Sequence, residues 1–221
     1  MKKTMLTLSA VAWSLVLGSA FAAGPEKGGK APAQKAKAAE AEAAPKMDPA
    51  QQAMMEKMMK MGTPGENHRV LDAFVGKWNC TVKNIMNPGD KPQESKGTSE
   101  SKWIMGGRFL EQDFNGEPMM GMGPFQGLGI TGYDNMKGEY NSIWLDNMGT
   151  GMMTSRSSYN AAAKTIEETG SFSCPVTGEK EKRFTGGLKI IDHDHYTYEM
   201  YFTGHDGKPF KSLEINYVRA K

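Results

Sequence analysis

The sequence is poor in cysteine, and it carries no excess of charge of either sign. Only two of its 221 residues are cysteine, Cys80 and Cys174, so the chain has room for at most one disulfide bond of its own. It carries 27 basic and 25 acidic residues, and residues 1–22 hold two of the basic ones and no acid, which leaves a net charge of zero without that segment. Because nucleic-acid binding needs a surplus of basic side chains, this balance argues against a nucleic-acid partner.

Long apolar runs are also scarce, since the only one lies near residue 1. It follows Lys2 and Lys3, covers residues 5–17 and is too short to span a membrane. Small residues at the two positions that a signal peptidase reads place a cleavage site after Ala22, and no cysteine follows that could carry a lipid. We therefore expect residues 1–22 to be a bacterial signal peptide. The protein is then periplasmic or secreted, and the cleaved chain does not insert into a membrane.

Motifs for catalysis and metal binding are missing as well. There is no Gly-x-Ser-x-Gly elbow that would place a nucleophilic serine. His193, Asp194 and His195 fall in a predicted hairpin turn with no third metal ligand nearby, and His68 and His205 are isolated. A haem would need an axial ligand, usually a histidine on a strand, and these histidines fall in turns or in a helix. We therefore expect no cofactor, no metal site and no catalytic residue, and we interpret the protein as non-enzymatic.

Two segments precede the predicted strands. Residues 23–47 are rich in Ala, Lys, Glu, Pro and Gly and contain no aromatic residue, so they cannot bury enough apolar surface to fold, and we expect a disordered tether. Asp48 is a predicted N-cap and Pro49 a first helical residue, which predicts a helix over 48–62. A second short helix is expected over 66–74.

Methionine is abundant, with 18 residues. Thioethers are soft ligands for copper(I), so methionine clusters raise a soft-metal site as an alternative function. Methionine is also an adaptable core filler, and a stripe at helical spacing favours packing of the helix against the body of the protein. The clusters are Met54, Met55, Met58, Met59 and Met61 on the first helix, and three methionines in the loop 119–125.

From residue 77 onward the apolar period changes from helical to two. In the first strand Trp78, Cys80 and Val82 face one side and the residues between them the other. The regular spacing and the glycine-rich turns are typical of an antiparallel meander, which predicts one domain over 63–221. Closure into an all-β barrel removes exposed edges, and a two-sheet sandwich is the alternative. The ten predicted strands cover 77–86, 94–105, 108–116, 126–133, 139–146, 150–159, 164–173, 181–190, 195–203 and 208–219.

A barrel of this size either fills its interior with side chains or encloses one small ligand. Our first hypothesis is a binding protein for a small apolar or amphipathic ligand, held in an aromatic cavity of a few hundred Å³. The alternative is a structural or interaction module whose barrel is filled. The predicted ligand-binding residues are Trp103, Phe125, Tyr133 and Trp144, with Arg108 orienting a polar end.

Several motifs resemble those of known families. Gly76-Lys77-Trp78, after a short helix, resembles the opening of lipocalin-like (calycin) barrels. Five longer motifs are similar to a bacterial secreted family known as domain of unknown function 1579, over roughly residues 52–220. These motifs are TPGENH at 63–68, ESKGT at 94–98, WIMGGRFLEQ at 103–112, GYDN at 132–135 and WLDNMGTG at 144–151.

The resemblance implies a lipocalin-like barrel of about ten antiparallel strands with an N-terminal helical segment, and it implies no activity. In calycin barrels the tryptophan closes one end beneath a basic residue of the last strand, which here would set Arg219 over Trp78. The family usually has other residue types at the positions of Cys80 and Cys174, which favours a disulfide between them over two separate buried thiols.

Overall fold

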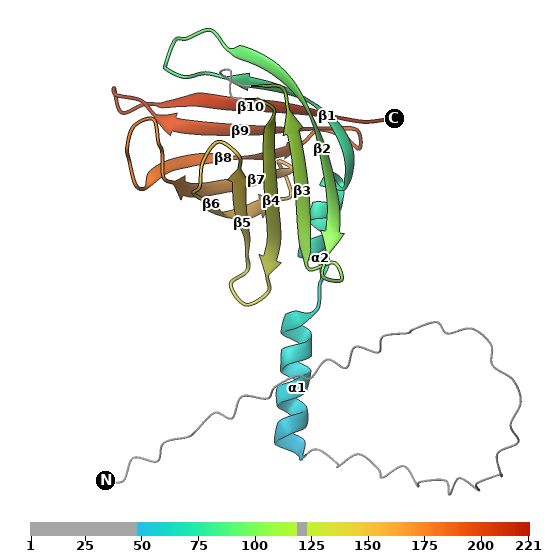
Figure 1. Cartoon of the computed structure of the whole chain (residues 1–221). Helices are drawn as coiled ribbons and strands as arrows, with labels where there is room; N and C mark the ends of the chain where they lie inside the picture. The colour runs from blue at the N-terminus through green and yellow to red at the C-terminus, as the bar shows by residue number, and fades with distance from the viewer. Residues whose placement is uncertain (1–47, 119–122) are drawn as a thin grey trace, which may run out of the picture. The chain divides into compact units, whose positions relative to one another are not determined.

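The computed structural model describes residues 48–118 and 123–221 (Figure 1). The predicted signal peptide (1–22) and tether (23–47) lie outside the described residues, as do residues 119–122 of the methionine-containing loop. No helix in the described part is both long and apolar enough to cross a membrane.

The first helix, α1 (Pro49–Gly62), begins where the sequence predicts. The Asp48 side chain accepts hydrogen bonds from the backbone N–H groups of Ala50 and Gln51, and the Gln51 side chain accepts from the Asp48 N–H, which completes a capping box. The methionine stripe does not pack, however, because no residue of α1 is buried and Met54 is 66% exposed. The interpretation of the stripe as a packing face is therefore wrong.

Two short helices close one end of the barrel, α2 (Glu66–Arg69) and η1 (Val70–Phe74), which is a 3₁₀-helix. His68 is buried, and its Nδ1 accepts a hydrogen bond from the Gly65 N–H over 3.1 Å. Leu71 and Phe74 of η1 are buried in the barrel core. Burying each of them contributes about 1.5–3 kcal/mol to stability, and this burial fixes the helices to the barrel.

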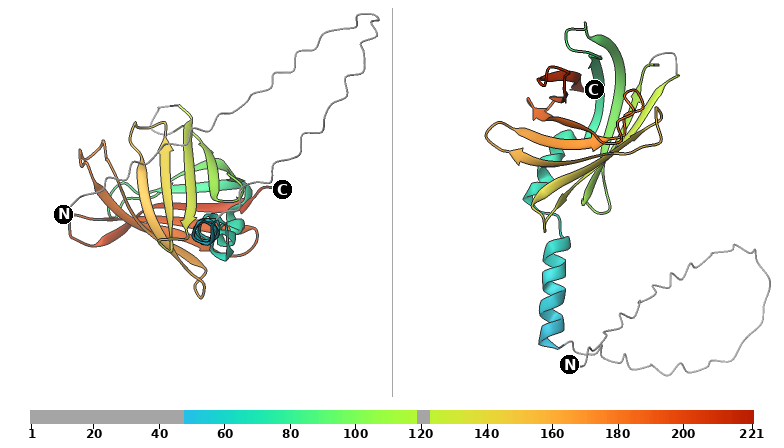
Figure 2. Two further views of the ribbon diagram at one scale, coloured as in Figure 1. Left: turned by 90° about the horizontal axis from the view of Figure 1, so that it is seen from below. Right: turned by 90° about the vertical axis from the view of Figure 1, so that its left-hand side faces the viewer.

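Ten strands follow and form a closed antiparallel barrel, in which each strand pairs with its sequence neighbours and β1 pairs with β10 (Figures 1 and 2). The predicted all-β barrel with an N-terminal helical segment is confirmed, and the sandwich alternative is wrong. The strands are β1 (Gly76–Asn84), β2 (Gln93–Ile104), β3 (Phe109–Gly116), β4 (Phe125–Asp134), β5 (Glu139–Asp146), β6 (Met153–Asn160), β7 (Thr165–Phe172), β8 (Lys182–Ile190), β9 (His195–Thr203) and β10 (Pro209–Arg219).

The end of the barrel that η1 occupies is called the closed end below. There the indole N–H of Trp78 donates to the carbonyl of Phe74 over 2.8 Å. The ring of Trp78 meets that of Tyr196 edge-on at 4.7 Å between centroids, and Phe74 meets Tyr196 in the same way at 4.9 Å. This aromatic contact joins η1, β1 and β9 into one packed unit.

Arg219 covers the closed end from outside. Its guanidinium carbon lies 4.1 Å from the centre of the Trp78 ring, and Nη1 donates to the carbonyl of Val75 over 2.8 Å. Gly76, with φ +119°, makes room for this arrangement, because a Cβ there would lie 2.7 Å from Nη1 of Arg219. The structure thus brings together the two residues that the calycin resemblance implied.

The two cysteines do not form a disulfide, so that prediction is wrong. Cys80 faces the barrel core from β1, where its cross-strand neighbours are Gly97 and Tyr217. Cys174 follows β7, and the strands β8, β9 and β10 lie between β7 and β1 along the sheet. Because adjacent strands lie about 4.8 Å apart, the positions are too far from one another for a bond that needs Cα atoms within about 7 Å. Burial raises the pKa of the Cys80 thiol to about 12, so it stays protonated.

Candidate functional site

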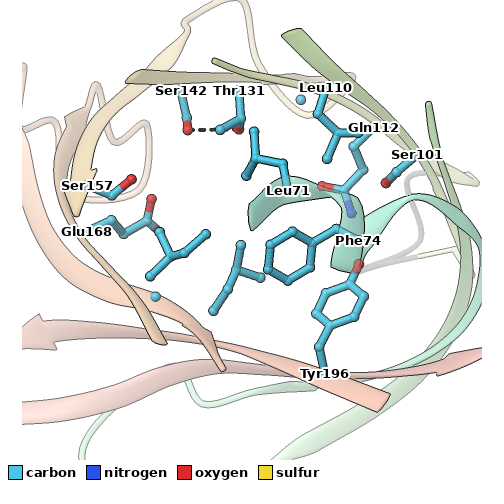
Figure 3. Close-up of a pocket in the computed structure, with 14 residues that line it drawn as sticks. Leu71, Phe74, Ser101, Leu110, Gln112, Thr131, Ser142, Ser157, Glu168 and Tyr196 are labelled. Carbon is cyan, nitrogen blue, oxygen red and sulfur yellow. Dashed lines mark hydrogen bonds between the residues drawn. The ribbon is translucent and has the colours of Figure 1, made fainter. Parts of the chain in front are cut away.

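The barrel encloses a cavity of about 70 Å³ between η1 and the middle of the strands (Figure 3). A water molecule occupies about 30 Å³ in the liquid, so the space suits a few waters or a molecule of a few heavy atoms. It is smaller than the cavity of a few hundred Å³ that we predicted. Its lining is Leu71, Phe74, Ser101, Leu110, Gln112, Gly129, Thr131, Ser142, Ser157, Ile166, Glu168, Gly187, Leu188 and Tyr196.

One side of the cavity is polar, and it comes from four consecutive strands. Thr131 of β4 pairs across the ladder with Ser142 of β5, and Ser157 of β6 pairs with Glu168 of β7. We call these four residues the polar belt. The register of the strands places them at neighbouring levels, and Figure 3 shows them along one wall. The hydroxyl oxygens of Thr131 and Ser142 lie 2.9 Å apart and share a hydrogen bond.

Glu168 supplies a carboxyl group to this wall, and two hydroxyl groups hold it. The hydroxyl of Ser155 donates to Oε2 over 2.8 Å. Tyr198 is also hydrogen-bonded to Glu168, and burial together with the nearby Glu168 raises the pKa of Tyr198 well above its ordinary value. Tyr198 therefore stays protonated and donates to the carboxyl group, which fixes its orientation.

Gln112 of β3 supplies an amide beside the belt. Its Nε2 donates to the hydroxyl of Ser99 over 3.0 Å and to that of Tyr217 over 3.5 Å. Burial raises the pKa of Tyr217, so this phenol is neutral at every physiological pH. Since the amide nitrogen faces these partners, the carbonyl oxygen of Gln112 is turned toward the cavity, as Figure 3 shows.

Two serines of the lining are buried. Ser101 is 2% exposed and Ser157 is 7% exposed. Both border the cavity, and no fully buried side-chain nitrogen or oxygen atom in the described part of the chain lacks a hydrogen-bond partner. A hydroxyl group that borders a cavity can bind water or a polar group of a guest.

The opposite side of the cavity is apolar. Leu71 and Phe74 reach into it from η1, and Ile166 and Leu188 enter from β7 and β8. Figure 3 shows Leu71 in the middle of the cavity and Phe74 beside Tyr196. The cavity is therefore amphipathic, because hydroxyl, amide and carboxyl groups line it together with apolar side chains.

The five predicted ligand-binding residues do not line this cavity. At the closed end, the Trp103 indole donates to Asp72 over 2.8 Å, and Tyr133 packs edge-on against Tyr140 at 4.9 Å. Arg108 is exposed in the turn after β2 and donates to the carbonyl of Met105.

Phe125 and Trp144 lie at the opposite end of the barrel. Their rings stack at 6.5 Å, and Phe114 meets Phe125 edge-on at 5.9 Å. The ring of Trp144 lies against the backbone of β4 at Gly127, where a Cβ would overlap it. The structure therefore brings Phe125 and Trp144 together and separates them from Trp103, Tyr133 and Arg108.

A second hollow lies at this far end, outside the core. It is a shallow recess of about 490 Å³ that is open to solvent. Asn147 forms part of its wall, where it accepts from the Gln126 N–H over 3.0 Å and donates to the carbonyl of Pro124 over 2.9 Å. An open recess excludes little water, so it offers a ligand less than the enclosed cavity does.

No metal centre is found among the described residues, since they contain no group of three or more His, Cys, Asp or Glu side chains arranged to hold a metal ion. The two histidines of the predicted turn are each hydrogen-bonded to a neighbouring carboxylate. His193 Nδ1 lies 2.8 Å from Asp194, and His195 Nδ1 lies 2.8 Å from Asp192.

The residues that sequence reasoning missed are the polar ones of the interior. A signal was present, because Ser99 and Ser101 share the inward parity of Trp103, and Ser155 and Ser157 stand at alternating positions of one strand. Alternating serines on the inward face of a strand indicate a polar interior, whereas we followed the aromatic residues.

Comparison with known proteins identifies a family and a fold. The profile of the family described as "Protein of unknown function (DUF1579)" matches residues 63–219. No curated protein matches the chain. The crystal structure of Rv2717c from M. tuberculosis is similar over 72% of this chain and 100% of that chain, with 15% identity and a TM-score of 0.55, which supports the barrel fold alone.

Two redesigned barrels also match. The first, b11L5F_LGL, is 16% identical, covers 69% of this chain and 96% of its own, and has a TM-score of 0.37. The second, mFAP1 bound to DFHBI, is 17% identical, covers 68% of this chain and 99% of its own, and has a TM-score of 0.36.

Proposed function

Since the chain belongs to the DUF1579 family, whose function is unknown, we propose a function from the cavity itself: the protein is a non-enzymatic barrel that binds one small amphipathic molecule in its interior. The observation that carries the proposal is the polar belt opposite Leu71 and Phe74. Interiors that serve only stability are usually apolar, because each unpaired buried hydroxyl lowers stability. Ser101 and Ser157 also line this cavity, where their hydroxyl groups can bind water or a guest.

The volume limits the guest. A molecule of about five heavy atoms fits the space, and small ligands gain at most about 1.5 kcal/mol per heavy atom. The upper limit for binding is then about −7 kcal/mol, which corresponds to a dissociation constant in the micromolar range. A larger guest would have to displace Phe114, Phe125 or Trp144 at the far end, and we keep Phe125 and Trp144 as candidate contacts for such a molecule.

The place of action is part of the proposal. The charged start, short apolar run and small residues of 1–22 support export to a bacterial periplasm or to the exterior. A carrier in that compartment would take up its guest from a dilute mixture, for which an enclosed site with a few polar contacts is suited.

The test is native mass spectrometry of the protein purified from its native host, followed by extraction and identification of the guest. We expect a discrete added mass. Replacing Ser157 by leucine fills the cavity and should remove that mass, whereas Ser158→Leu places the same side chain on the exposed face of β6 and should not. A wild-type protein without added mass would contradict the proposal and favour the alternative of a filled barrel that serves as a structural or interaction module.

The exposed face of α1 supports a second candidate function, soft-metal binding. Met54, Met58 and Met59 are each more than 60% exposed, and Met55 is 46% exposed. Residues three and four apart are neighbours on a helix, so several thioethers can meet one copper(I) ion.

Equilibrium dialysis with copper(I) tests this second candidate. Loss of binding in a variant with leucine at Met54, Met55, Met58 and Met59 would support it. A matched control places leucine at Met136 and Met152, which are exposed on the barrel. If the wild-type protein shows no binding at micromolar copper(I), this candidate function is excluded.

A further inference from the structure

The proposed function leaves the polar group of the ligand unspecified, and the charges around the cavity define it. We propose that the cavity selects a hydrogen-bond donor, and specifically a small primary amine whose ammonium group binds Glu168. This inference rests on the proposed function, because it names the chemical class of the guest in the same cavity.

The charged groups that line the cavity favour a cationic guest. Glu168 is the one carboxyl group among the residues that line the cavity, and the described lining contains no Lys, Arg or His. An anion placed there would meet a carboxyl group of like charge with no cation to compensate it. Fatty acids and other small carboxylates are therefore poor guests, whereas a cation would be compensated by Glu168.

The acceptors in the cavity match an ammonium group. A carboxylate offers about four lone-pair sites, and Ser155 and Tyr198 use two of those on Glu168. An ammonium group has three N–H donors. Ser157 lies directly across the ladder from Glu168 and also lines the cavity, so its hydroxyl oxygen is a second acceptor for the same group.

The carboxyl group of Glu168 is preorganised for a donor. Glu168 does not need to move to receive a donor, because Ser155 and Tyr198 already fix its orientation. Tyr198 keeps its proton and does not transfer it to Glu168, since the pKa of Tyr198 is raised by burial and by the nearby Glu168. The hydrocarbon part of the amine would lie on Leu71, Ile166 and Leu188, which form the other side of the cavity.

The probes for the test are n-butylamine, n-butanol and butyrate, which have four carbon atoms each and differ in the polar group. Titration of the isotope-labelled full chain, followed by backbone amide shifts in NMR, gives a dissociation constant for each. We expect n-butylamine to bind at least about tenfold more tightly than n-butanol, because a charge-assisted hydrogen bond is roughly twice as strong as a neutral one. Butyrate should bind most weakly of the three.

A matched pair of variants assigns the preference to one side chain. Glu168→Gln should abolish the advantage of the amine over the alcohol, whereas Glu167→Gln, on the exposed face of the same strand, should preserve it. Thermal unfolding of both variants verifies that they are folded. The rank order in the wild-type protein tests the inference even if Glu168→Gln does not fold.

The outcomes separate the two proposals. Butanol or butyrate binding as tightly as butylamine would overturn the amine inference and leave the carrier function in place. No shift with any probe, together with a bare mass of the native protein, would overturn both. An amine preference that survives in Glu168→Gln would also overturn the inference, since another group would then hold the donor.

Discussion

The closed end of the barrel and the polar belt use neighbouring positions of one sheet, but they are built in different ways. At the closed end, the Trp78 indole is bonded to η1, packed against Tyr196 and covered by Arg219. In the polar belt, Ser157 is also buried, at 7% exposed, but its side chain borders the cavity. The comparison separates the part of the interior that stabilises the fold from the part that is available for a guest.

The largest expected effect is the loss of Trp78, which is 1% exposed. Trp78→Ala should lower the free energy of unfolding by about 3–5 kcal/mol, because it leaves a large hole and removes the bond to Phe74. Urea unfolding measures the change. A loss below about 1 kcal/mol would show that the closed end does not carry the stability that we assign to it.

A smaller effect is expected from Arg219, which holds the closed end from outside. Arg219→Met keeps the length of the side chain and removes the hydrogen bonds to Val75 and His193 and the contact with Trp78. We expect a loss of about 1–3 kcal/mol in the same unfolding experiment. Lys77→Met, an exposed position of β1, is the control and should change the free energy of unfolding by less than about 0.5 kcal/mol.

Glu214 lies on the outer face of β10, outside both the closed end and the polar belt, and its pKa makes the stability of the protein depend on pH. Lys211 and Lys83 lower the pKa of Glu214 from 4.5 to about 2, with hydrogen bonds of 2.6 Å and 3.2 Å and a further one from Asn216. Because the folded pKa is below the unfolded one, this stabilisation is complete above pH 4.5 and is lost as the pH falls toward about 2.

Glu214→Gln tests this pH dependence. The variant should be less stable than the wild type by about 1–2 kcal/mol at neutral pH, and the difference should shrink in acid. Thermal unfolding of both proteins between neutral pH and pH 2 measures the difference. A gap that does not change with pH would mean that the ion pairs are not its source.

The smallest effect on stability is expected in the polar belt. Ser157→Val replaces the hydroxyl group and one Cβ hydrogen by two methyl groups at a position that borders the cavity, so the free energy of unfolding should change by less than about 1 kcal/mol in either direction. Binding of the guest should nevertheless be lost. A loss of stability comparable to that of Trp78→Ala would remove the distinction between the two regions.

The fold could be predicted from the sequence because each strand shows its own pattern and is followed by a turn signal. The alternation around Trp78 and the turns at regular intervals predict ten antiparallel strands, and the structure has them. The short helical segment before β1 was also predicted. These features depend on local spacing, which a sequence displays directly.

The volume of the cavity could not be predicted, because it depends on how deeply η1 enters the barrel. The depth of Leu71 and Phe74 decides how much volume remains, and no local pattern encodes it. Trp103 has the parity of an interior residue, yet its indole is bonded to Asp72 of η1. The distance between Cys80 and Cys174 could not be predicted either, since it is set by the order of strands around the barrel.

The seam between β1 and β10 has a consequence for the order of folding events. All other neighbouring strands are consecutive in the chain and can pair as hairpins, whereas this pair must join segments that are distant in sequence. Loop-closure entropy makes such a pairing slow, so the barrel should close last at this seam. The seam has Trp78 opposite Arg219 near one end and Lys83 opposite Glu214 near the other. These pairs thus stabilise the strand pairing that forms last, and weakening either should speed unfolding more than it slows folding.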